Sequence, residues 1–158
     1  MSNINTYWFR TWQRLAYNNY IHHTVRIGEG TKLKRNIEIR ANVTIGENCY
    51  IDSGCTFTGG STIGNNVTIR NNCVIARGSF IGDNCFLSPQ TMFANLDTQG
   101  NKIGGAQLSY NVFVGTNVTF HHGVTVAPYS VIASKSFVNK DINEPNRTWG
   151  GVPAKLLK

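Results

Sequence analysis

A large apolar residue recurs every six positions along most of this 158-residue chain. A period of six fits neither an α-helix, which repeats every 3.6 residues, nor a single strand, which repeats every two. The repeat keeps one frame through residue 93 and resumes in a shifted frame at residue 108. Its sites are Ile27, Leu33, Ile39, Ile45, Ile51, Phe57, Ile63, Ile69, Ile75, Ile81, Leu87, Phe93, Leu108, Val114, Phe120, Val126, Ile132 and Val138. A fixed period of this kind indicates stacked structural units that share one continuous core.

Two further columns of the repeat indicate what each unit is. The residue two places before each apolar site is small or β-branched, which suits a short strand. The residue three places after it is Asn or Gly at Asn36, Asn42, Asn48, Gly54, Gly60, Asn66, Asn72, Gly78, Asn84, Asn111, Asn117 and Gly123. These residues tolerate a positive φ at low cost. Each hexad is therefore predicted to be a short strand and a tight corner, and three hexads close one coil of an all-β, parallel β-helix with coils about 4.8 Å apart.

The two ends of such a β-helix are predicted to differ from its wall. Residues 1–26 are expected to form a capping segment, because the open edge of the first coil must be covered. Within it, Trp8, Trp12 and Leu15 share one face of a short N-terminal helix predicted over residues 5–20. Docking of that helix on a membrane surface is the less favoured alternative. The β-helix itself is predicted over residues 27–143, and residues 144–158 form a C-terminal tail.

The composition limits the classes of partner. All four cysteines lie two places before an apolar site, so they are predicted to be buried and reduced in the core rather than in disulfides or a metal site. The net charge of +7 suits an anionic ligand, but no aromatic and basic platform for nucleic acid is evident. The chain has no apolar run of membrane-spanning length and no signal-peptide pattern at its start, which predicts a cytoplasmic protein.

The break in the frame predicts an extruded loop over residues 95–107. Phe93 and Leu108 are fifteen residues apart, which equals one hexad plus nine residues or two hexads plus three. A polar segment expelled from a regular wall is a frequent place for function. If nine residues bulge out, Arg77, Asn95 and His122 fall in one column beside the loop. If a second hexad is absorbed, His122 moves to another face, and the sequence leaves both possibilities open.

Candidate catalytic residues follow from this column. The four histidines form two adjacent pairs, at residues 22–23 and 121–122. His121 or His122 can remove a proton from a hydroxyl or ammonium group of a substrate. Asn95 can orient that group or stabilise an oxyanion. Arg77 and Asp97 are candidates for substrate binding. No metal is expected, because the histidine spacing does not match a three-histidine zinc site.

The array of hexads and the ending "SVIASKSFVNKDINEPNRTWGGVPAKLLK" resemble the hexapeptide-repeat acyltransferase superfamily over about residues 27–158. The resemblance implies a left-handed β-helix, a homotrimer, and acetyl-CoA bound in a groove between neighbouring subunits. It implies that Lys140 and Lys155 lie near the CoA phosphates. It also implies that Ala133 and Ser134 line the pantetheine arm. The cations gathered in the last coils fit an anionic donor of this kind.

The stretch "CFLSPQTMFAN" (85–95) is similar to a segment of nucleotide-linked amino-sugar N-acetyltransferases. The Pro-Arg pair that usually follows in those enzymes is absent, as is the Thr-His-Pro histidine of the galactoside and maltose O-acetyltransferases. The resemblance therefore predicts an acetyl-CoA-dependent acetyltransferase acting on a small sugar in surface-polysaccharide synthesis, with an amino group the favoured acceptor. The alternatives are transfer to a sugar hydroxyl and a non-catalytic β-helical scaffold.

Overall fold

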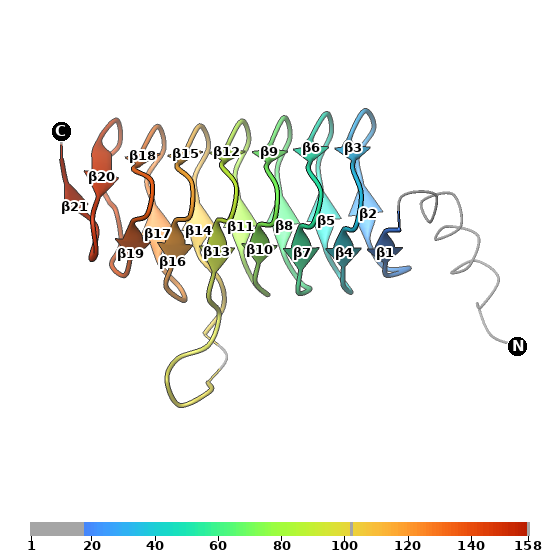
Figure 1. Ribbon diagram of the computed structural model, residues 1–158, viewed down its shortest axis with the longest axis horizontal. Helices are drawn as coiled ribbons and strands as arrows, with labels where there is room; N and C mark the ends of the chain where they lie inside the picture. The colour runs from blue at the N-terminus through green and yellow to red at the C-terminus, as the bar shows by residue number, and fades with distance from the viewer. Residues whose placement is uncertain (1–17, 102, 158) are drawn as a thin grey trace, which may run out of the picture.

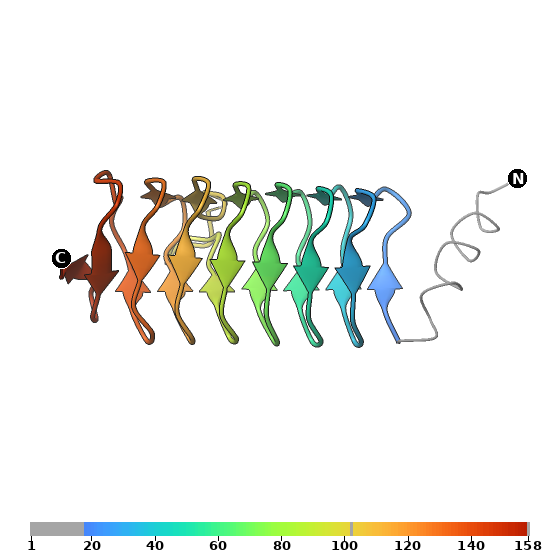
Figure 2. The ribbon, with the colours of Figure 1, turned by 90° about the horizontal axis from the view of Figure 1, so that it is seen from above.

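The computed structural model describes residues 18–101 and 103–157, and these form the predicted left-handed parallel β-helix (Figures 1 and 2). Three parallel sheets make its walls. Sheet A contains β1 (Tyr20–Ile21), β4 (Glu38–Ile39), β7 (Thr56–Phe57), β10 (Val74–Ile75), β13 (Met92–Phe93), β16 (Thr119–Phe120) and β19 (Phe137–Val138). Sheet B contains β2 (Arg26–Ile27), β5 (Thr44–Ile45), β8 (Thr62–Ile63), β11 (Phe80–Ile81), β14 (Gln107–Leu108) and β17 (Thr125–Val126). Sheet C contains β3 (Lys32–Leu33), β6 (Tyr50–Ile51), β9 (Thr68–Ile69), β12 (Phe86–Leu87), β15 (Phe113–Val114), β18 (Val131–Ile132), β20 (Thr148–Gly150) and β21 (Lys155–Leu156).

The corners between the sheets form as the sequence predicts. Every Asn and Gly assigned to a corner has a positive φ, from 53° at Asn48 to 78° at Gly54. A residue with a Cβ is strained in this conformation, and Asn is strained less than most because its side chain bonds locally. The backbone can therefore turn after each strand, and residues one full coil apart come into register, as Ile39 does with Phe57.

The core is the column of apolar hexad sites. From Ile39 onward these side chains are buried, whereas Ile27 and Leu33, in the first coil, are only partly buried and pack against the cluster. Phe93 and Phe120 lie on adjacent coils with ring centroids 4.9 Å apart. Full burial of a side chain of this size stabilises the fold by about 1.5–3 kcal/mol. The stack is thus the main stabilising element of the molecule.

The four cysteines are free and buried, which confirms the prediction for them. Their thiols bond to carbonyl oxygens of the next coil, as Cys49 Sγ does to Gly64 O at 3.1 Å and Cys85 Sγ to Ser109 O at 3.0 Å. Burial raises the pKa of the Cys85 thiol to about 11. Because the thiolate is the reactive form, the Cys85 side chain acts as a small apolar residue at neutral pH. The hydrogen bond with Cys55 lowers the pKa of the Cys73 thiol instead, so at Cys73 it is burial that keeps reagents away.

Both ends of the β-helix differ from the predicted bounds. The wall already contains Tyr20–Ile21, one hexad before Ile27. The predicted helix over residues 5–20 is not supported where it can be checked, because Asn18 has a φ of 55° and β1 begins at Tyr20. The rest of that range lies outside the described residues. At the other end, β20 and β21 extend sheet C, and the antiparallel β21 covers its last edge. No helix in the described part of the chain has the length and apolar character needed to cross a membrane.

Burial of the cysteines predicts slow thiol chemistry in the folded protein. We expect a thiol reagent such as DTNB to label none of the four cysteines at pH 7.5 within minutes, and all four in 6 M guanidinium chloride. Spectrophotometric titration measures both numbers. Rapid labelling of one or more thiols in the native protein would contradict the assigned core.

Candidate functional site

Polar side chains gather along the corner that follows sheet A. We call the residues one and two places beyond each strand of this sheet the A–B corner. One place beyond lie His22, Arg40, Thr58, Ala76, Ala94, His121 and Asn139. Two places beyond lie His23, Ala41, Gly59, Arg77, Asn95, His122 and Lys140. The spacing of about 4.8 Å between coils turns these residues into two lines along one edge of the prism.

The strand pairing decides between the two interpretations of the break. β13 pairs with β10 on one side and with β16 on the other. Phe93 is paired with Phe120, twenty-seven residues later, whereas ordinary neighbours are eighteen apart, so nine residues are extra. Arg77, Asn95 and His122 therefore share one column, as the nine-residue bulge requires. The loop between β13 and β14 projects away from the row of coils (Figure 1).

The base of the loop is fixed to the wall by backbone hydrogen bonds. The carbonyl oxygen of Asn95 accepts from Ile103 N at 3.1 Å and from Gly104 N at 3.2 Å. Gly105 N then donates to Arg77 O at 2.9 Å, which restores the ladder. Ala106 is buried and Gln107 begins β14, so the excursion covers about residues 95–104 of the predicted 95–107.

The tip of the loop is organised by Asp97. Its carboxylate accepts hydrogen bonds from Gln99 N at 2.9 Å, Asn101 N at 2.8 Å and Asn101 Nδ2 at 2.6 Å. The side-chain bond from Asn101 is the main cause that lowers the pKa of Asp97, and His122 contributes by its charge. Asp97 and His122 thus interact electrostatically, although Asp97 already serves to hold the loop in shape.

His122 is the most distinctive side chain of the corner. Its Nδ1 atom is buried and has no hydrogen-bond partner among the described residues. Its ring centroid lies 3.9 Å from that of His121, whose own ring meets Phe137 edge-on at 5.9 Å. A buried polar atom without a partner costs about 1–3 kcal/mol, and Trp149 Nε1 in β20 is the other such atom among the described residues. The imidazole of His122 is held in place by its neighbours while one nitrogen stays available.

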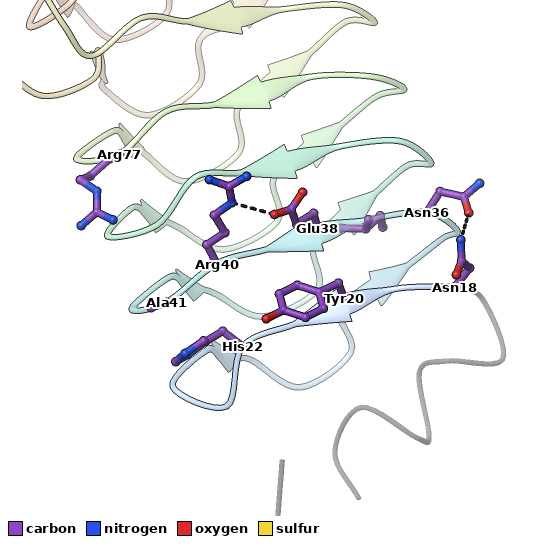
Figure 3. Close-up of a pocket in the computed structure, with 9 residues that line it drawn as sticks. Asn18, Tyr20, His22, Asn36, Glu38, Arg40, Ala41 and Arg77 are labelled. Atoms are coloured by element: carbon purple, nitrogen blue, oxygen red, sulfur yellow. Dashed lines mark hydrogen bonds and ion pairs between the residues drawn. The ribbon is translucent and has the colours of Figure 1, made fainter. Parts of the chain in front are cut away.

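Arg77 lies in the predicted column but points away from His122. A Cβ atom built at Gly59 would come within 3.3 Å of Arg77 Nη2, so the guanidinium lies over the preceding coil. Figure 3 shows it extending toward Ala41, on the face that carries Arg40 and His22. The absence of a side chain at Gly59 leaves the room for this orientation. The structure therefore separates Arg77 from Asn95 and His122 in direction, though not in column.

The four residues expected to contact a cofactor divide between two corners. Ala133 and Ser134 follow β18 at the corner between sheets C and A, where Ala133 N donates to Trp149 O at 2.8 Å and Ser134 Oγ accepts from Thr116 N at 3.1 Å. Lys155 lies beside them in β21, paired with Gly150.

Lys140 stands instead at the A–B corner, one coil beyond His122, because Phe120 pairs with Val138. Sheet A separates the two groups.

The comparisons with known proteins agree with this architecture. The family model described as the GMPPB C-terminal domain matches residues 15–147, most of the chain. The chain belongs to this family. No curated protein sequence matches it significantly.

Several solved structures share the fold of this chain at low identity. AntD, an N-acyltransferase from Bacillus cereus solved as a point mutant with dTDP-4-amino-4,6-dideoxyglucose and coenzyme A, has a TM-score of 0.74 at 17% identity, with 95% of this chain and 88% of that chain covered. PerB from Caulobacter crescentus, solved with CoA and GDP-perosamine, has a TM-score of 0.68 at 22% identity, covering 94% and 66%. The acetyltransferase domain of PglB from Neisseria gonorrhoeae, solved with acetyl coenzyme A, has a TM-score of 0.63 at 16% identity, covering 97% and 66%. The chain spans about two thirds of the PerB and PglB chains.

Two features of the site were missed from the sequence. His22 and His23 stand at the same corner positions as His121 and His122, because β1 adds one strand of sheet A before Ile27. The apolar Ile21, six residues before Ile27, was the signal that could have shown it. The second feature is the orientation of the Arg77 side chain, which nothing in the repeat pattern indicates. No group of three or more His, Cys, Asp or Glu side chains in the described ranges could hold a metal ion.

The hydrogen bonds of Asp97 predict a protease-sensitive loop when they are removed. Lys102 is the single trypsin site between Arg77 and Lys135, so cleavage there reports on the loop alone. We expect Asp97→Ala to speed cleavage after Lys102 several-fold, with the thermal midpoint almost unchanged because the carboxylate lies at the surface. Mass spectrometry of a limited digest measures the rate.

Asp83→Ala is the matched control, because Asp83 caps a corner of another wall by accepting from Asn65 N. Equal cleavage rates in wild type and Asp97→Ala would contradict the role of Asp97. Because the pKa of Asp97 is lowered in the folded loop, its contribution is present above the ordinary pKa and is lost as the pH falls through the lowered value.

Proposed function

We propose that this protein is an acetyl-CoA-dependent acetyltransferase whose acceptor is the amino group of a nucleotide-linked amino sugar. The observation that carries the proposal is the A–B corner, where an extruded loop leaves the wall at Asn95, one coil from a buried, unpartnered nitrogen of His122. Three proteins of the same fold, AntD, PerB and PglB, were solved with CoA or acetyl-CoA, and two of them with a nucleotide amino sugar. These similarities support the choice of donor and acceptor.

The reaction needs a group that accepts a proton. The acceptor is an ammonium ion at neutral pH, and only the free amine has the electron pair that attacks the thioester carbonyl. His122 is suited to take that proton, because a neutral imidazole nitrogen accepts a proton and Nδ1 of this ring has no partner among the described residues. As the carbon–nitrogen bond forms and the carbon–sulfur bond breaks, CoA leaves as the thiolate and takes up the second proton, which the nitrogen loses as it becomes an amide. The proton on His122 then passes to solvent. Asn95 is suited to orient the acceptor, and the loop around Asp97 to keep water from the reacting atoms.

We infer that the active assembly is a homotrimer. In one chain the expected CoA contacts at Ala133, Ser134 and Lys155 lie at the corner opposite to His122 and Lys140, across sheet A. Rotation about an axis parallel to the β-helix brings the C–A corner of one copy to the A–B corner of the next. A site divided in this way is complete only between subunits. Sedimentation equilibrium should therefore give three times the mass of the chain, and a monomer that transfers acetyl groups at full rate would contradict the assembly.

The setting we propose for the enzyme is the cytoplasm, where acetyl-CoA and nucleotide sugars are both made. An N-acetylated amino sugar on a nucleotide carrier is a building block for surface polysaccharides. This is the use that the proposed reaction best suits.

The role of His122 predicts a defined kinetic defect. We expect His122→Ala to lower kcat for thiol release from acetyl-CoA by roughly 100- to 10,000-fold, with KM for acetyl-CoA nearly unchanged. The defect should shrink as the pH rises toward the pKa of the acceptor, because the amine then loses its proton to solvent. The buried native cysteines keep the background of a DTNB assay low.

His23→Ala is the matched control, since His23 holds the equivalent corner position at the other end of the prism. His121→Ala separates the two rings of the stacked pair. An unchanged kcat in His122→Ala would remove His122 from the mechanism. No thiol release with any nucleotide-linked amino sugar, combined with no binding of CoA, would overturn the proposed function.

A further inference from the structure

A pocket of about 700 Å³ lies on the first coils of sheet A, away from the loop. Its wall includes Tyr20, His22, Arg40 and Arg77, with Glu38 and two asparagines at its edge. Figure 3 shows these side chains on one face, contributed by β1, β4 and the corner after β10. The pocket combines two guanidinium groups with an aromatic ring that is half exposed. Such a combination favours an anionic, planar ligand.

One of the two guanidinium groups in the pocket is paired with a carboxylate and the other is not. Arg40 Nε donates to Glu38 Oε1 at 2.7 Å, so this pair is internally balanced. The guanidinium group of Arg77 has no ion pair or hydrogen bond with any residue in the described ranges, yet it lies over Gly59 rather than extending into solvent. The net charge of these groups is positive before His22 is counted. An oxyanion that bonds to Arg77 would balance this remaining positive charge.

The position of the pocket limits what the ligand can be. Arg77 stands two coils before His122 along the A–B corner, a distance of about 10 Å at the usual coil spacing. Arg40 stands two coils further from His122. A molecule lying along this edge with its acceptor group at His122 would thus carry its anionic part past Arg77 toward Arg40. A sugar joined to a nucleoside diphosphate has this order of groups: sugar, two phosphates, then a planar base.

We propose that the Arg40–Arg77 pocket binds the nucleoside diphosphate of the acceptor, with the phosphates on Arg77 and the base beside Tyr20. This inference rests on the proposed function and assigns a binding site that the reaction itself does not specify. A diphosphate is also part of CoA, but the residues expected to bind CoA lie at the far end of the prism, in the coils of Ala133 and Lys155. The pocket is therefore assigned to the acceptor.

The first test measures binding directly on the full chain. We expect UDP, GDP or dTDP to bind the wild type in isothermal titration calorimetry, and Arg77→Gln to raise that Kd roughly 10- to 100-fold, as loss of a charged hydrogen bond does. The Kd of acetyl-CoA should not change. Arg26→Gln, which removes the same charge from the exposed face of sheet B, is the matched control and should change neither Kd.

A second variant tests Arg40 without leaving an unpaired carboxylate in the pocket. Arg40→Gln alone leaves the carboxylate of Glu38 unpaired in the pocket, so the double variant Glu38→Gln/Arg40→Gln removes the ion pair without adding a charge. It should also weaken binding of the nucleoside diphosphate. Circular dichroism confirms that each variant is folded. If no nucleoside diphosphate binds the wild type, or if Arg77→Gln weakens acetyl-CoA instead, the assignment is wrong.

The activity arm separates this inference from the proposed function. With a nucleotide-linked amino sugar, Arg77→Gln should raise KM by a similar factor while kcat changes little. With the free amino sugar at high concentration, Arg77→Gln and wild type should react alike. Wild-type activity with an unchanged KM in Arg77→Gln overturns the pocket and leaves the function. Loss of nucleoside diphosphate binding in Arg77→Gln, in a protein with no transferase activity, overturns the function and leaves the pocket.

Discussion

The backbone hydrogen bonds that run from each coil to the next determine the rest of this structure. They hold residues eighteen apart at the same height of adjacent coils, as in the pair Ile39 and Phe57. The side chains of one column then stack at about 4.8 Å, and every column is either core, wall or corner along its length. The apolar column inside the prism supplies the free energy of folding. The corner columns outside it are free to carry chemistry at fixed spacing.

This regularity explains why so much of the fold could be predicted from the sequence. A residue such as Ile75 is buried because of its place in the hexad, and Asn72 turns the chain because Asn accepts a positive φ. Both requirements are local, so they are written into each six-residue unit. The break at residue 95 could be located in the same way. The number of residues that leave the wall could not be predicted, because one hexad plus nine residues and two hexads plus three obey the same local rules. Only the pairing of β13 with β16 separates the two.

The candidate site was less predictable because it depends on where side chains point as well as on where the residues lie in the repeat. The column of Arg77, Asn95 and His122 follows from counting, once the pairing is known. The turn of Arg77 over Gly59, however, depends on the space that a missing side chain leaves on the neighbouring coil. The equivalence of the two histidine pairs was hidden by a first coil that begins at Tyr20. Contacts between coils carry such information, and a hexad pattern describes each coil separately.

The way the loop returns to the wall suggests how this fold keeps scaffold and site independent. Gly104 has a φ of 104°, and a Cβ at Gly105 would collide with the side chain of Ser79, so re-entry needs two glycines in succession. Once Gly105 N has bonded to Arg77 O, the ladder continues through Ala106 and Gln107 as if no residue had been inserted. Residues 96–103 can therefore change in length and composition without altering the register of β14 on β11. Loop residues can then set what reaches His122 while the ladder alone sets where His122 stands.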